Sequence, residues 1–361
     1  MSLLLIGGCG LSKSVRRKKN ILKGKLFEII VRILLKNAGY IPITPDGVHI
    51  RRGDGKVRGR GYWHDIDALG RFWLPLFFMY PIRLLAEAKY YEKKIGLGFV
   101  RNFVGALKDI AENYFVDDKL SPGQIFAYQR YTDCGSFFSV SGFTRGAQRY
   151  ALAQGVFLIS YQNNPIFIRI VDLMEIVIDS INLTKSVKEL KDYEKWIKTI
   201  FTGNRQILYG DNFVKKGDLH RFSEGINQLR QELDSIETST IAMIITRNRT
   251  IQYPVHILSY QRIPEELFRT SDEQRFRVHF TETPRGLLFE LRPVEAPQVR
   301  LYFSLPRDIY RRYFEEGRMP EFKRSFLREI EMPMTLGGIR RVLNFKLDLE
   351  WIRGLEEQNR D

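Results

Sequence analysis

The sequence predicts an α/β fold for the first half of the chain and a separate α+β domain for the second half. Residues 25–171 alternate between helical and strand-like periodicity, a pattern typical of a sheet covered by helices. The chain has 361 residues, of which 44% are hydrophobic and 13% aromatic, so it can build two cores. The whole chain carries a net charge of +15, whereas residues 176–361 contain thirty-one basic and twenty-eight acidic residues. This change in composition indicates a second domain.

A helix is expected over residues 25–38, with Gly39 as its C-terminal stop. Its polar residues are spaced by three and four and form one stripe, namely Lys25, Glu28, Arg32 and Lys36. The apolar residues between them face a core. Glu28 is therefore either an exposed acid paired with Arg32 at the fourth position along, or an acid that lines a functional cleft.

Residues 42–61 form an expected loop or hairpin that is rich in glycine and arginine. Glycine lets a backbone approach a ligand closely, and arginine can hold a phosphate with two hydrogen bonds. Positions 1–60 carry fourteen basic but only three acidic residues, so this part of the chain suits a polyanion. Arg58 and Arg60 are the candidates for DNA contact here. The alternatives are a mobile surface turn and a basic segment that only aids solubility.

Two strands are expected next, over residues 62–70 and 82–90. Side chains two apart point to the same face of a strand, so Asp65 should share a face with Asp67, and Glu87 with Lys89. Carboxylates are hard oxygen ligands that suit Mg²⁺, and a nearby lysine can position a nucleophile or stabilise charge on a phosphate. The two strands therefore predict a site that combines a metal with a lysine.

The alternation of helices and strands continues after the second strand. Residues 93–113 have helical periodicity, and the basic residues near the start of this helix are candidates for phosphate contact, namely Lys93, Lys94 and Arg101. The remaining expected elements are a strand over 136–140, a helix over 144–153, a strand over 156–161 and a turn at 163–165 that leads into 166–171.

This series of motifs resembles the Mrr-type restriction endonuclease domain of the PD-(D/E)xK nuclease superfamily. The resemblance covers about residues 24–172, and it rests on the G-x-x-F-E, D-x-D, E-x-K and F-T-x-x-A patterns of residues 24–28, 65–67, 87–89 and 143–147. Two features depart from the family pattern. Ala88 stands where the family often has cysteine, and the unusually apolar residues 72–82 fall between the two strands.

The resemblance implies a restriction-endonuclease-like αβα core with a mixed central sheet. It makes Asp67 and Glu87 the ligands of Mg²⁺, or alternatively Mn²⁺, Lys89 the catalytic lysine and Glu28 the acid contributed by the helix. Asp65 is the substitute ligand if the register of the strand differs. The implied activity is metal-dependent hydrolysis of phosphodiester bonds in double-stranded DNA, of the restriction type and with modification-dependent cleavage as one form. The alternatives are a DNA-binding protein with an inactive nuclease-like core and a repair or junction-resolving nuclease.

The expected domains are a basic lead-in over residues 1–23, the nuclease domain over 24–175 and an α+β domain over 176–361. Apolar residues at four-three-four-three spacing fit either a helix packed on its own sheet or a short coiled-coil seam of a homodimer, namely Phe222, Ile226, Leu229, Leu233 and Ile236. Strands are expected over 241–246, 255–260, 277–280, 287–291 and 299–304. Target recognition, dimerisation and regulation all remain open as roles of this domain.

Composition excludes several other classes of protein. Cys9 and Cys134 are the only cysteines and the five histidines are scattered, so neither a disulfide framework nor a zinc site is expected. The sequence has no G-x-S-x-G elbow and no nucleotide-binding loop of the Walker type. The apolar residues 72–86 include two prolines and an arginine and are fewer than the ~20 that a membrane-spanning helix needs. We therefore expect a cytoplasmic protein without a membrane partner.

Overall fold

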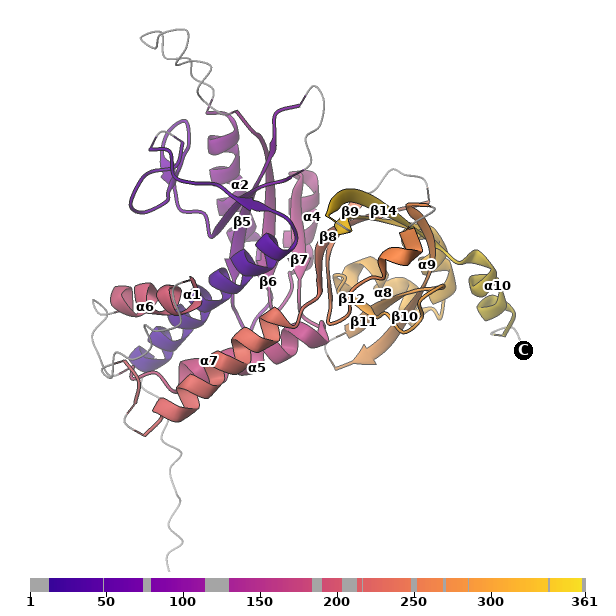
Figure 1. Ribbon diagram of the computed structural model, residues 1–361. Coiled ribbons are helices and arrows are strands. Elements are labelled where there is room, and N and C mark those ends of the chain that lie inside the picture. Colours follow the sequence, from indigo (N-terminus) through magenta and orange to yellow (C-terminus); the bar gives the residue numbers. More distant parts are fainter. Residues whose placement is uncertain are drawn as a thin grey trace, which may run out of the picture.

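The computed structural model describes residues 13–47, 49–73, 79–113, 130–183, 190–202, 213–215, 217–247, 252–268, 271–284, 286–336 and 338–358. The first twelve residues of the expected lead-in lie outside this set. The described chain forms a sheet covered by helices and, beside it, a closed β-barrel (Figure 1).

The first sheet is mixed, as the sequence predicts. Its strands are β1 (Ile41–Pro42), β4 (Ala68–Arg71), β5 (Ile82–Lys89), β6 (Thr132–Ser139) and β7 (Val156–Ser160), in this spatial order. β4 pairs antiparallel with β1 and with β5, whereas β5, β6 and β7 run parallel to one another. The α/β class of this part of the chain is therefore confirmed.

Helices cover both faces of this sheet. One face carries α1 (Lys13–Asn37), α5 (Pro165–Asp179), α6 (Leu190–Thr202) and α7 (Leu219–Asp234), and the other carries α2 (Leu97–Ala111) and α4 (Arg145–Ala153). The alternation along β5 shows the two layers, because Ala86 and Ala88 join the core under α1 while Leu85 joins the core under α2. Residues at even positions of β5 thus face α1 and those at odd positions face α2.

Helix α1 is longer than the sequence predicts. It begins at Lys13, so the described part of the expected basic lead-in is helical and belongs to the folded body. Two of the added charges pair with acids of α5, since Lys19 forms ion pairs with Glu175 and Asp179, and Lys23 pairs with Glu175. The local sequence predicts that these basic residues face solvent in a lead-in segment. In the structure, acids of α5 bind Lys19 and Lys23.

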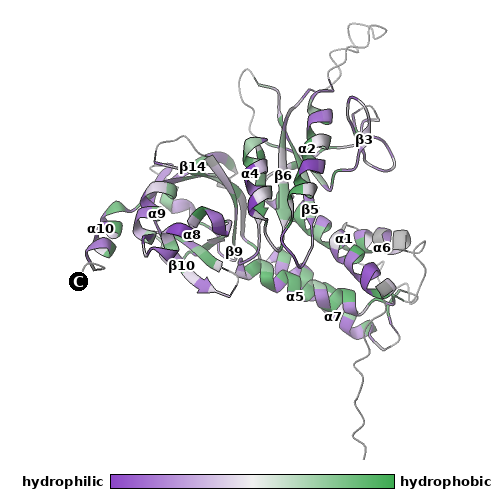
Figure 2. Cartoon of the chain, turned by 180° about the vertical axis from the view of Figure 1, so that it is seen from behind, coloured by the Kyte–Doolittle hydropathy of each residue, from purple (hydrophilic) through white to green (hydrophobic). Residues whose placement is uncertain are grey.

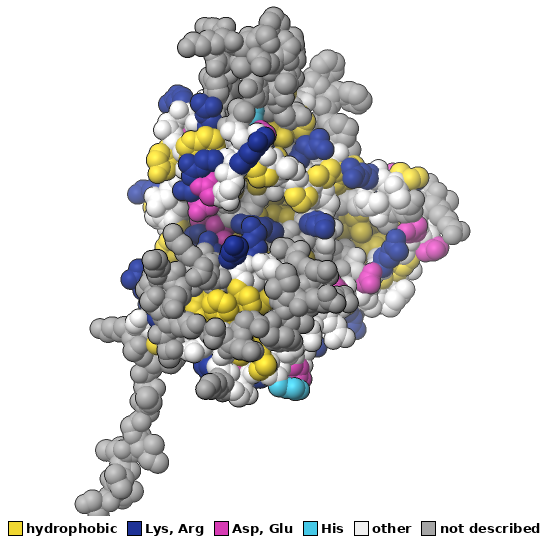
Figure 3. Space-filling view, turned by 60° about the vertical axis from the view of Figure 1, so that its left-hand side comes forward, with side chains coloured by type: hydrophobic (Ala, Val, Ile, Leu, Met, Phe, Trp, Pro, Cys, Tyr) yellow, Lys and Arg dark blue, Asp and Glu magenta, His cyan; other side chains and the backbone are white. Residues whose placement is uncertain are grey.

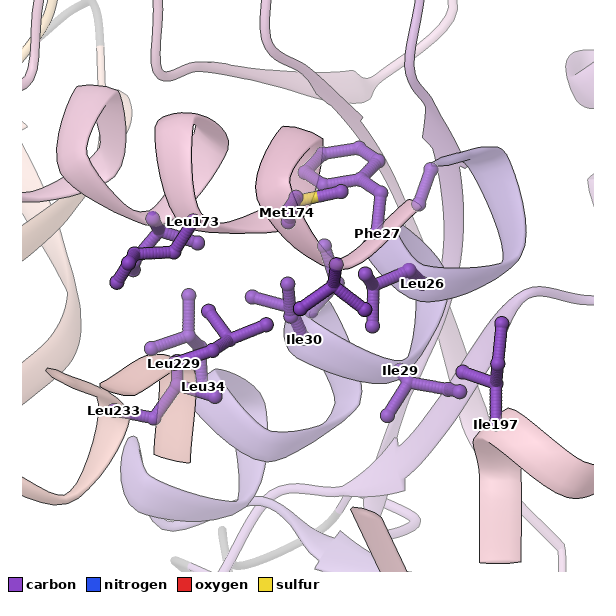
Figure 4. Packing of buried hydrophobic residues seen from close by; sticks show 14 of the residues in the cluster. Leu26, Phe27, Ile29, Ile30, Leu34, Leu173, Met174, Ile197, Leu229 and Leu233 are labelled. Atoms are coloured by element: carbon purple, nitrogen blue, oxygen red, sulfur yellow. The ribbon is translucent and has the colours of Figure 1, made fainter. Parts of the chain in front are cut away.

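The core under α1 continues beyond residue 175. Figure 4 shows Leu26, Phe27 and Ile30 of α1 packed beside Met174 of α5, with Leu229 of α7 nearby. Apolar residues from α6 and α7, among them Ile197, Leu229 and Leu233, belong to the same buried cluster. The predicted domain boundary at 175/176 therefore does not coincide with a break in packing, because these two helices complete the first core.

The structure decides between a coiled-coil seam and a helix packed within its own chain for the apolar residues of α7. Phe222, Ile226, Leu229 and Leu233 are all buried within the chain. The ring of Phe222 stacks on Trp196 of α6, with centroids 5.1 Å apart. The helix is therefore packed inside its own molecule, against other helices, and these residues are not exposed as a coiled-coil seam.

The second half of the chain forms the barrel. Its strands are β8 (Thr238–Ile245), β9 (Gln252–Ser259), β10 (Glu273–Thr283), β11 (Gly286–Pro293), β12 (Leu301–Phe303), β13 (Glu329–Leu336) and β14 (Ile339–Leu347). The order is β10-β11-β12-β9-β8-β13-β14, and parallel pairing of β10 with β14 closes the ring. The strands expected from 241 to 304 are confirmed, whereas β13, β14 and the closure were not expected. A 3₁₀ helix (Glu265–Phe268), α8 (Arg307–Glu315), α9 (Met319–Phe326) and α10 (Leu349–Gln358) accompany the strands.

The barrel and the sheet touch through β9 and β7. The hydroxyl of Tyr253 on β9 donates to the carbonyl of Leu158 on β7 at 3.3 Å. Ser239 of β8 donates to the carbonyl of Leu34 at 3.1 Å, near the end of α1. The view from behind shows the largely hydrophobic helix α5 next to the barrel strand β9 (Figure 2). Hydrogen bonds thus join the two parts in addition to the connecting chain.

Candidate active site

Asp67 lies where the chain enters the sheet, and Asp65 lies outside it. The expected strand over residues 62–70 is in fact two strands, β3 (Trp63–His64) and β4, with residues 65–67 between them. β3 pairs with β2 (Val57–Arg58) in a separate hairpin. Asp65 is exposed and Asp67 is only 8% exposed, yet the negative charge of Asp65 still helps to raise the pKa of Glu87. Alternation along one continuous strand does not set the positions of the two aspartates, because the backbone leaves the hairpin before it joins β4.

Asp67 is held by the neighbouring strand β5. Its Oδ2 atom accepts a hydrogen bond from the backbone N–H of Ala88 at 2.9 Å and another from Nζ of Lys89 at 3.1 Å. Antiparallel pairing sets this geometry, because Ala68 lies opposite Ala86 and the two strands continue toward Asp67 and Glu87. The Nζ atom of Lys89 also lies 2.5 Å from Oε1 of Glu87. The structure thus brings together the three residues that the sequence pattern singles out on these strands.

Helix α1 supplies the fourth predicted residue. Glu28 is buried, and its carboxylate accepts from Nζ of Lys25 at 3.1 Å. The side chain of Arg32, one turn further along, donates from Nε to the carbonyl of Asp67 at 2.5 Å. The alternative in which Glu28 is an exposed acid paired with Arg32 is therefore wrong, because Glu28 is buried and Arg32 binds the backbone of Asp67.

Burial and mutual repulsion shift the protonation of these acids. Burial, followed by the negative charge of Asp67, raises the pKa of Glu28 to about 7. The same two causes raise the pKa of Glu87, although Lys89 acts in the opposite direction. Burial alone lowers the pKa of Lys89, but the charges of Asp67 and Glu87 outweigh it, so that pKa is raised above its usual range. The lysine is a cation at neutral pH, and it only partly offsets the acids around it.

These residues fit a divalent cation of the Mg²⁺ type. Among the described residues, no group of three or more His, Cys, Asp or Glu side chains is arranged to hold a metal. Mg²⁺ does not need such a group, since it commonly binds one or two carboxylates together with water and phosphate oxygens. Asp67 and Glu87 supply two carboxylates on adjacent strands, and the raised pKa of Glu87 beside Asp67 marks a repulsion that a cation would relieve.

The glycine- and arginine-rich segment is a hairpin attached to the C-terminal end of α2. The carboxylate of Asp109 accepts from the backbone N–H of Gly61 at 3.0 Å and lies 2.7 Å from Nε2 of His64. Arg60 donates its backbone N–H to the carbonyl of Asp109 and pairs with Glu112 at 3.5 Å. A Cβ atom at position 59 would lie 2.0 Å from the Asp109 carboxylate, so this approach requires Gly59. The segment is therefore held in place, and it is not the loosely attached turn of the alternative interpretation.

The other predicted DNA-binding residues lie toward the opposite end of α2. Lys93 and Lys94 precede the helix and Arg101 lies in its second turn, and all three are exposed. Arg101 covers the ring of Tyr150, with 5.7 Å between the guanidinium carbon and the ring centroid. A helix of fifteen residues is about 22 Å long. The structure therefore separates the five predicted residues into two groups, one near each end of α2.

Two groups near the site were not predicted from the sequence. Arg32 was noticed only as a partner of Glu28, and its contact with Asp67 joins residues 35 positions apart. Tyr90 follows the catalytic lysine candidate, and its hydroxyl donates to Glu175 on α5 at 2.8 Å. The sequence does show an aromatic residue directly after the E-x-K pattern, and this could have marked Tyr90 as part of the site. No local pattern, however, predicts its hydrogen bond to Glu175.

Comparison with known proteins adds little to this geometry. No protein-family model matches the chain, and no curated protein matches it. One solved structure, the crystal structure of a protein of unknown function, AF1548, aligns with 14% identity and a TM-score of 0.32, over 58% of this chain and 98% of that one. Within the described residues, no helix combines the length and apolar character needed to cross a membrane.

Proposed function

We propose that this protein is a Mg²⁺-dependent DNA endonuclease with a restriction-endonuclease-like core, acting on double-stranded DNA. The observation that carries the proposal is the position of Lys89 Nζ, 3.1 Å from Asp67 and 2.5 Å from Glu87 across two antiparallel strands. Two carboxylates that share one lysine at the ends of two neighbouring strands provide both metal ligands and a cation for the phosphate. The resemblance of the motif order to Mrr-type domains supports the same conclusion.

Each residue has a distinct role in this proposal. Asp67 and Glu87 hold the metal, which when bound activates water and offsets charge on the phosphate. Lys89 stays protonated at neutral pH and stabilises the additional negative charge of the phosphate in the transition state. Glu28, with a pKa of about 7, can accept a proton near neutral pH and is the candidate for proton transfer on the α1 side of Asp67. Arg32 positions Asp67 through its backbone carbonyl.

Charge outside the site supports DNA as the substrate. The chain has a net charge of +15, and Lys and Arg side chains are spread over much of the described surface in Figure 3. Arg58 and Arg60 on the hairpin, with Lys93, Lys94 and Arg101 near the other end of α2, are the proposed backbone contacts. We assign target reading, and with it a restriction-type role, to the barrel. A homodimer is part of the same proposal, because two sites can cut both strands of the duplex in one binding event.

The decisive experiment combines a metal series with a matched pair of aspartate variants. Purified protein is incubated with supercoiled plasmid, methylated or unmethylated, and with an oligonucleotide duplex that carries one unpaired nucleotide, in Mg²⁺, Mn²⁺ or EDTA. We expect cleavage with either metal and none in EDTA. Asp67→Asn keeps a hydrogen-bond acceptor for Ala88 but removes the charge, so cleavage should fall by ~100-fold or more.

Asp65→Asn is the matched control, because Asp65 is two residues away but exposed. It should cleave at close to the rate of the unmodified protein. Loss of activity in Asp65→Asn together with an active Asp67→Asn would reverse the assignment of the metal ligand. Absence of metal-dependent cleavage of all these DNAs would exclude the nuclease proposal and favour a DNA-binding protein with an inactive core.

A further inference from the structure

A cleft opens at the C-terminal ends of the parallel strands, directly after the candidate catalytic lysine. Its volume is about 580 Å³, within the range of pockets that hold small organic ligands. Its wall begins with Tyr90 and Tyr91, the two residues that follow Lys89, and continues through Ser141 and Gln162 after β6 and β7 to Asp172 and Glu175 on α5. A ligand in this cleft would therefore lie next to the proposed site of phosphodiester cleavage.

The cleft offers aromatic surface at two depths. Its floor contains Tyr161 and Phe167, whose rings stack with centroids 3.9 Å apart and planes 4° apart. At its rim, Tyr91 is 41% exposed and contacts Phe99, which is 43% exposed, with centroids 5.3 Å apart. The exposed parts of these two rings leave an apolar aromatic surface in contact with water at the mouth of the cleft. Such rings are the usual stacking surfaces for unpaired bases.

The polar groups of the cleft divide into satisfied and available ones. Glu175 is satisfied, since it accepts from Tyr90 at 2.8 Å and pairs with Lys19 and Lys23. Within the described residues, the side chain of Lys94 makes no hydrogen bond or ion pair, and neither does that of Asp172. The cleft thus presents one available cation and one available carboxylate beside an aromatic surface.

The aromatic surface, the cation and the carboxylate together fit one class of ligand better than the others. A paired duplex backbone carries only phosphate and sugar on its outside, and the carboxylates of Glu92, Asp172 and Glu175 would repel it. An apolar ligand would leave Lys94 and Asp172 without partners. A nucleotide whose base is unpaired satisfies all three features, because its base can stack on Tyr91, its amino group can donate to Asp172 and its phosphate can bind Lys94.

We propose that this cleft binds an unpaired nucleotide of the DNA substrate, so that the enzyme acts on duplexes that contain an unpaired or extruded base beside the cleaved bond. The proposal rests on the nuclease function proposed above and narrows its substrate class. Tyr91 stacks on the base, and Lys94 and Asp172 bind its two polar ends. Base recognition in this form lies in the sheet domain and is separate from any reading of sequence by the barrel.

The test is a binding measurement in EDTA, which needs no catalysis. Two fluorescein-labelled duplexes of equal length are compared by anisotropy, one fully paired and one with a single unpaired nucleotide. A second probe carries 2-aminopurine at the unpaired position, whose fluorescence reports stacking. We expect tighter binding of the unpaired probe and a fluorescence change on binding. Tyr91→Ala should weaken that binding by about 5- to 150-fold and leave the paired duplex within about 2-fold.

Three variants sharpen the result. Tyr91→Phe keeps the ring and should retain the preference, whereas Lys94→Ala should weaken binding of the unpaired probe. Tyr80→Ala is the matched control, because Tyr80 is 52% exposed but lies before the other end of β5. Equal affinity for the two duplexes, or equal losses on both in Tyr91→Ala, would overturn the proposal. The binding measurement and the cleavage assay test the two proposals separately. If the metal series shows cleavage but the two duplexes bind equally well, the nuclease proposal is kept and only the proposed binding of an unpaired nucleotide is rejected.

Discussion

The hydroxyl group of Tyr161 lies 2.6 Å from Nδ1 of His256, and this contact links the end of β7 to the barrel. Ser239 continues the chain of hydrogen bonds, since its hydroxyl donates to the carbonyl of Leu34 and its oxygen therefore accepts from Nε2 of His256 at 2.9 Å. With the hydrogen on Nε2, the Nδ1 atom accepts from Tyr161. His256 is thus neutral and has one defined tautomer.

The buried histidine predicts a loss of stability in mild acid. Burial lowers the pKa of His256 to about 3 from the 6.5 of an exposed histidine. Between these values the unfolded chain binds a proton that the folded chain does not, so stability is complete above pH 6.5 and falls as the pH falls toward 3. At pH 5.5 the expected loss is about 1 kcal/mol. Urea denaturation at pH 7.5 and 5.5, with His256→Gln as the comparison, isolates this contribution, and an equal pH response of both proteins would contradict it.

Glu28 predicts the opposite pH response. Its pKa of about 7 exceeds the ~4.3 of an unfolded glutamate, so its contribution to stability is complete below that lower value and is lost as the pH rises through 7. Glu28→Gln removes the buried charge. In EDTA, we expect the unfolding free energy of this variant, relative to that of the unmodified protein, to be about 3 kcal/mol higher at pH 8.5 than at pH 5. A pH-independent effect of Glu28→Gln on urea unfolding would show that Glu28 keeps an ordinary pKa.

Lys89→Ala should separate catalysis from binding. We expect cleavage to fall by ~100-fold or more, because the cation beside the phosphate is lost, while DNA affinity changes by less than about 2-fold. The matched control is Lys346→Ala, which also removes a lysine from an ion pair. Nζ of Lys346 lies 2.5 Å from the carboxylate of Glu273 on the barrel, the same distance as between Nζ of Lys89 and the carboxylate of Glu87. Gel-shift and plasmid assays on both variants measure the two effects, and parallel losses of binding and cleavage in Lys89→Ala would assign this lysine to binding.

The anchored hairpin predicts a change in salt dependence. Replacing Arg58 and Arg60 together with alanine should weaken DNA binding and reduce the slope of log affinity against log salt by about two. The control replaces Lys195 and Lys198, two exposed cations of α6 that lie outside the proposed DNA contacts and outside the barrel. Titrations between about 50 and 200 mM salt measure the slopes. A slope that stays the same in the hairpin variant would remove this segment from the DNA interface.

Packing of α6 and α7 predicts where the chain can be shortened. A fragment that ends at Asp179 lacks both helices and uncovers apolar residues of α1 and α5, so we expect it to aggregate or to unfold without a cooperative transition. A fragment that ends at Glu237 keeps both helices and should fold. Circular dichroism and thermal melting of the two fragments test this expectation, and a cooperative transition in the shorter fragment would show that the core ends before α6.

The sequence predicted what short-range periodicity determines. Helix α4 begins after Thr144 as expected, because Thr144 accepts from the backbone N–H of Ala147 and caps it. The pairing of Asp67 with Lys89 followed from two short motifs in apolar runs. Long-range partners could not be predicted, since the contact of Arg32 with Asp67 and the packing of α7 on α5 depend on tertiary structure. Closure of the barrel likewise depends on a pairing of β10 with β14 that no local pattern encodes.

The pairing of β4 with β5 has a consequence for insertions and deletions in this chain. Asp67 reaches Ala88 and Lys89 because Ala68 lies opposite Ala86, at the first of the four paired positions of β4, which end at Arg71. One residue added within those four would shift the pairing and turn Asp67 toward the other face of the sheet. An addition between residues 72 and 81 would leave the pairing unchanged. Differences in chain length among natural variants of this protein should therefore accumulate between the two strands and be absent within β4.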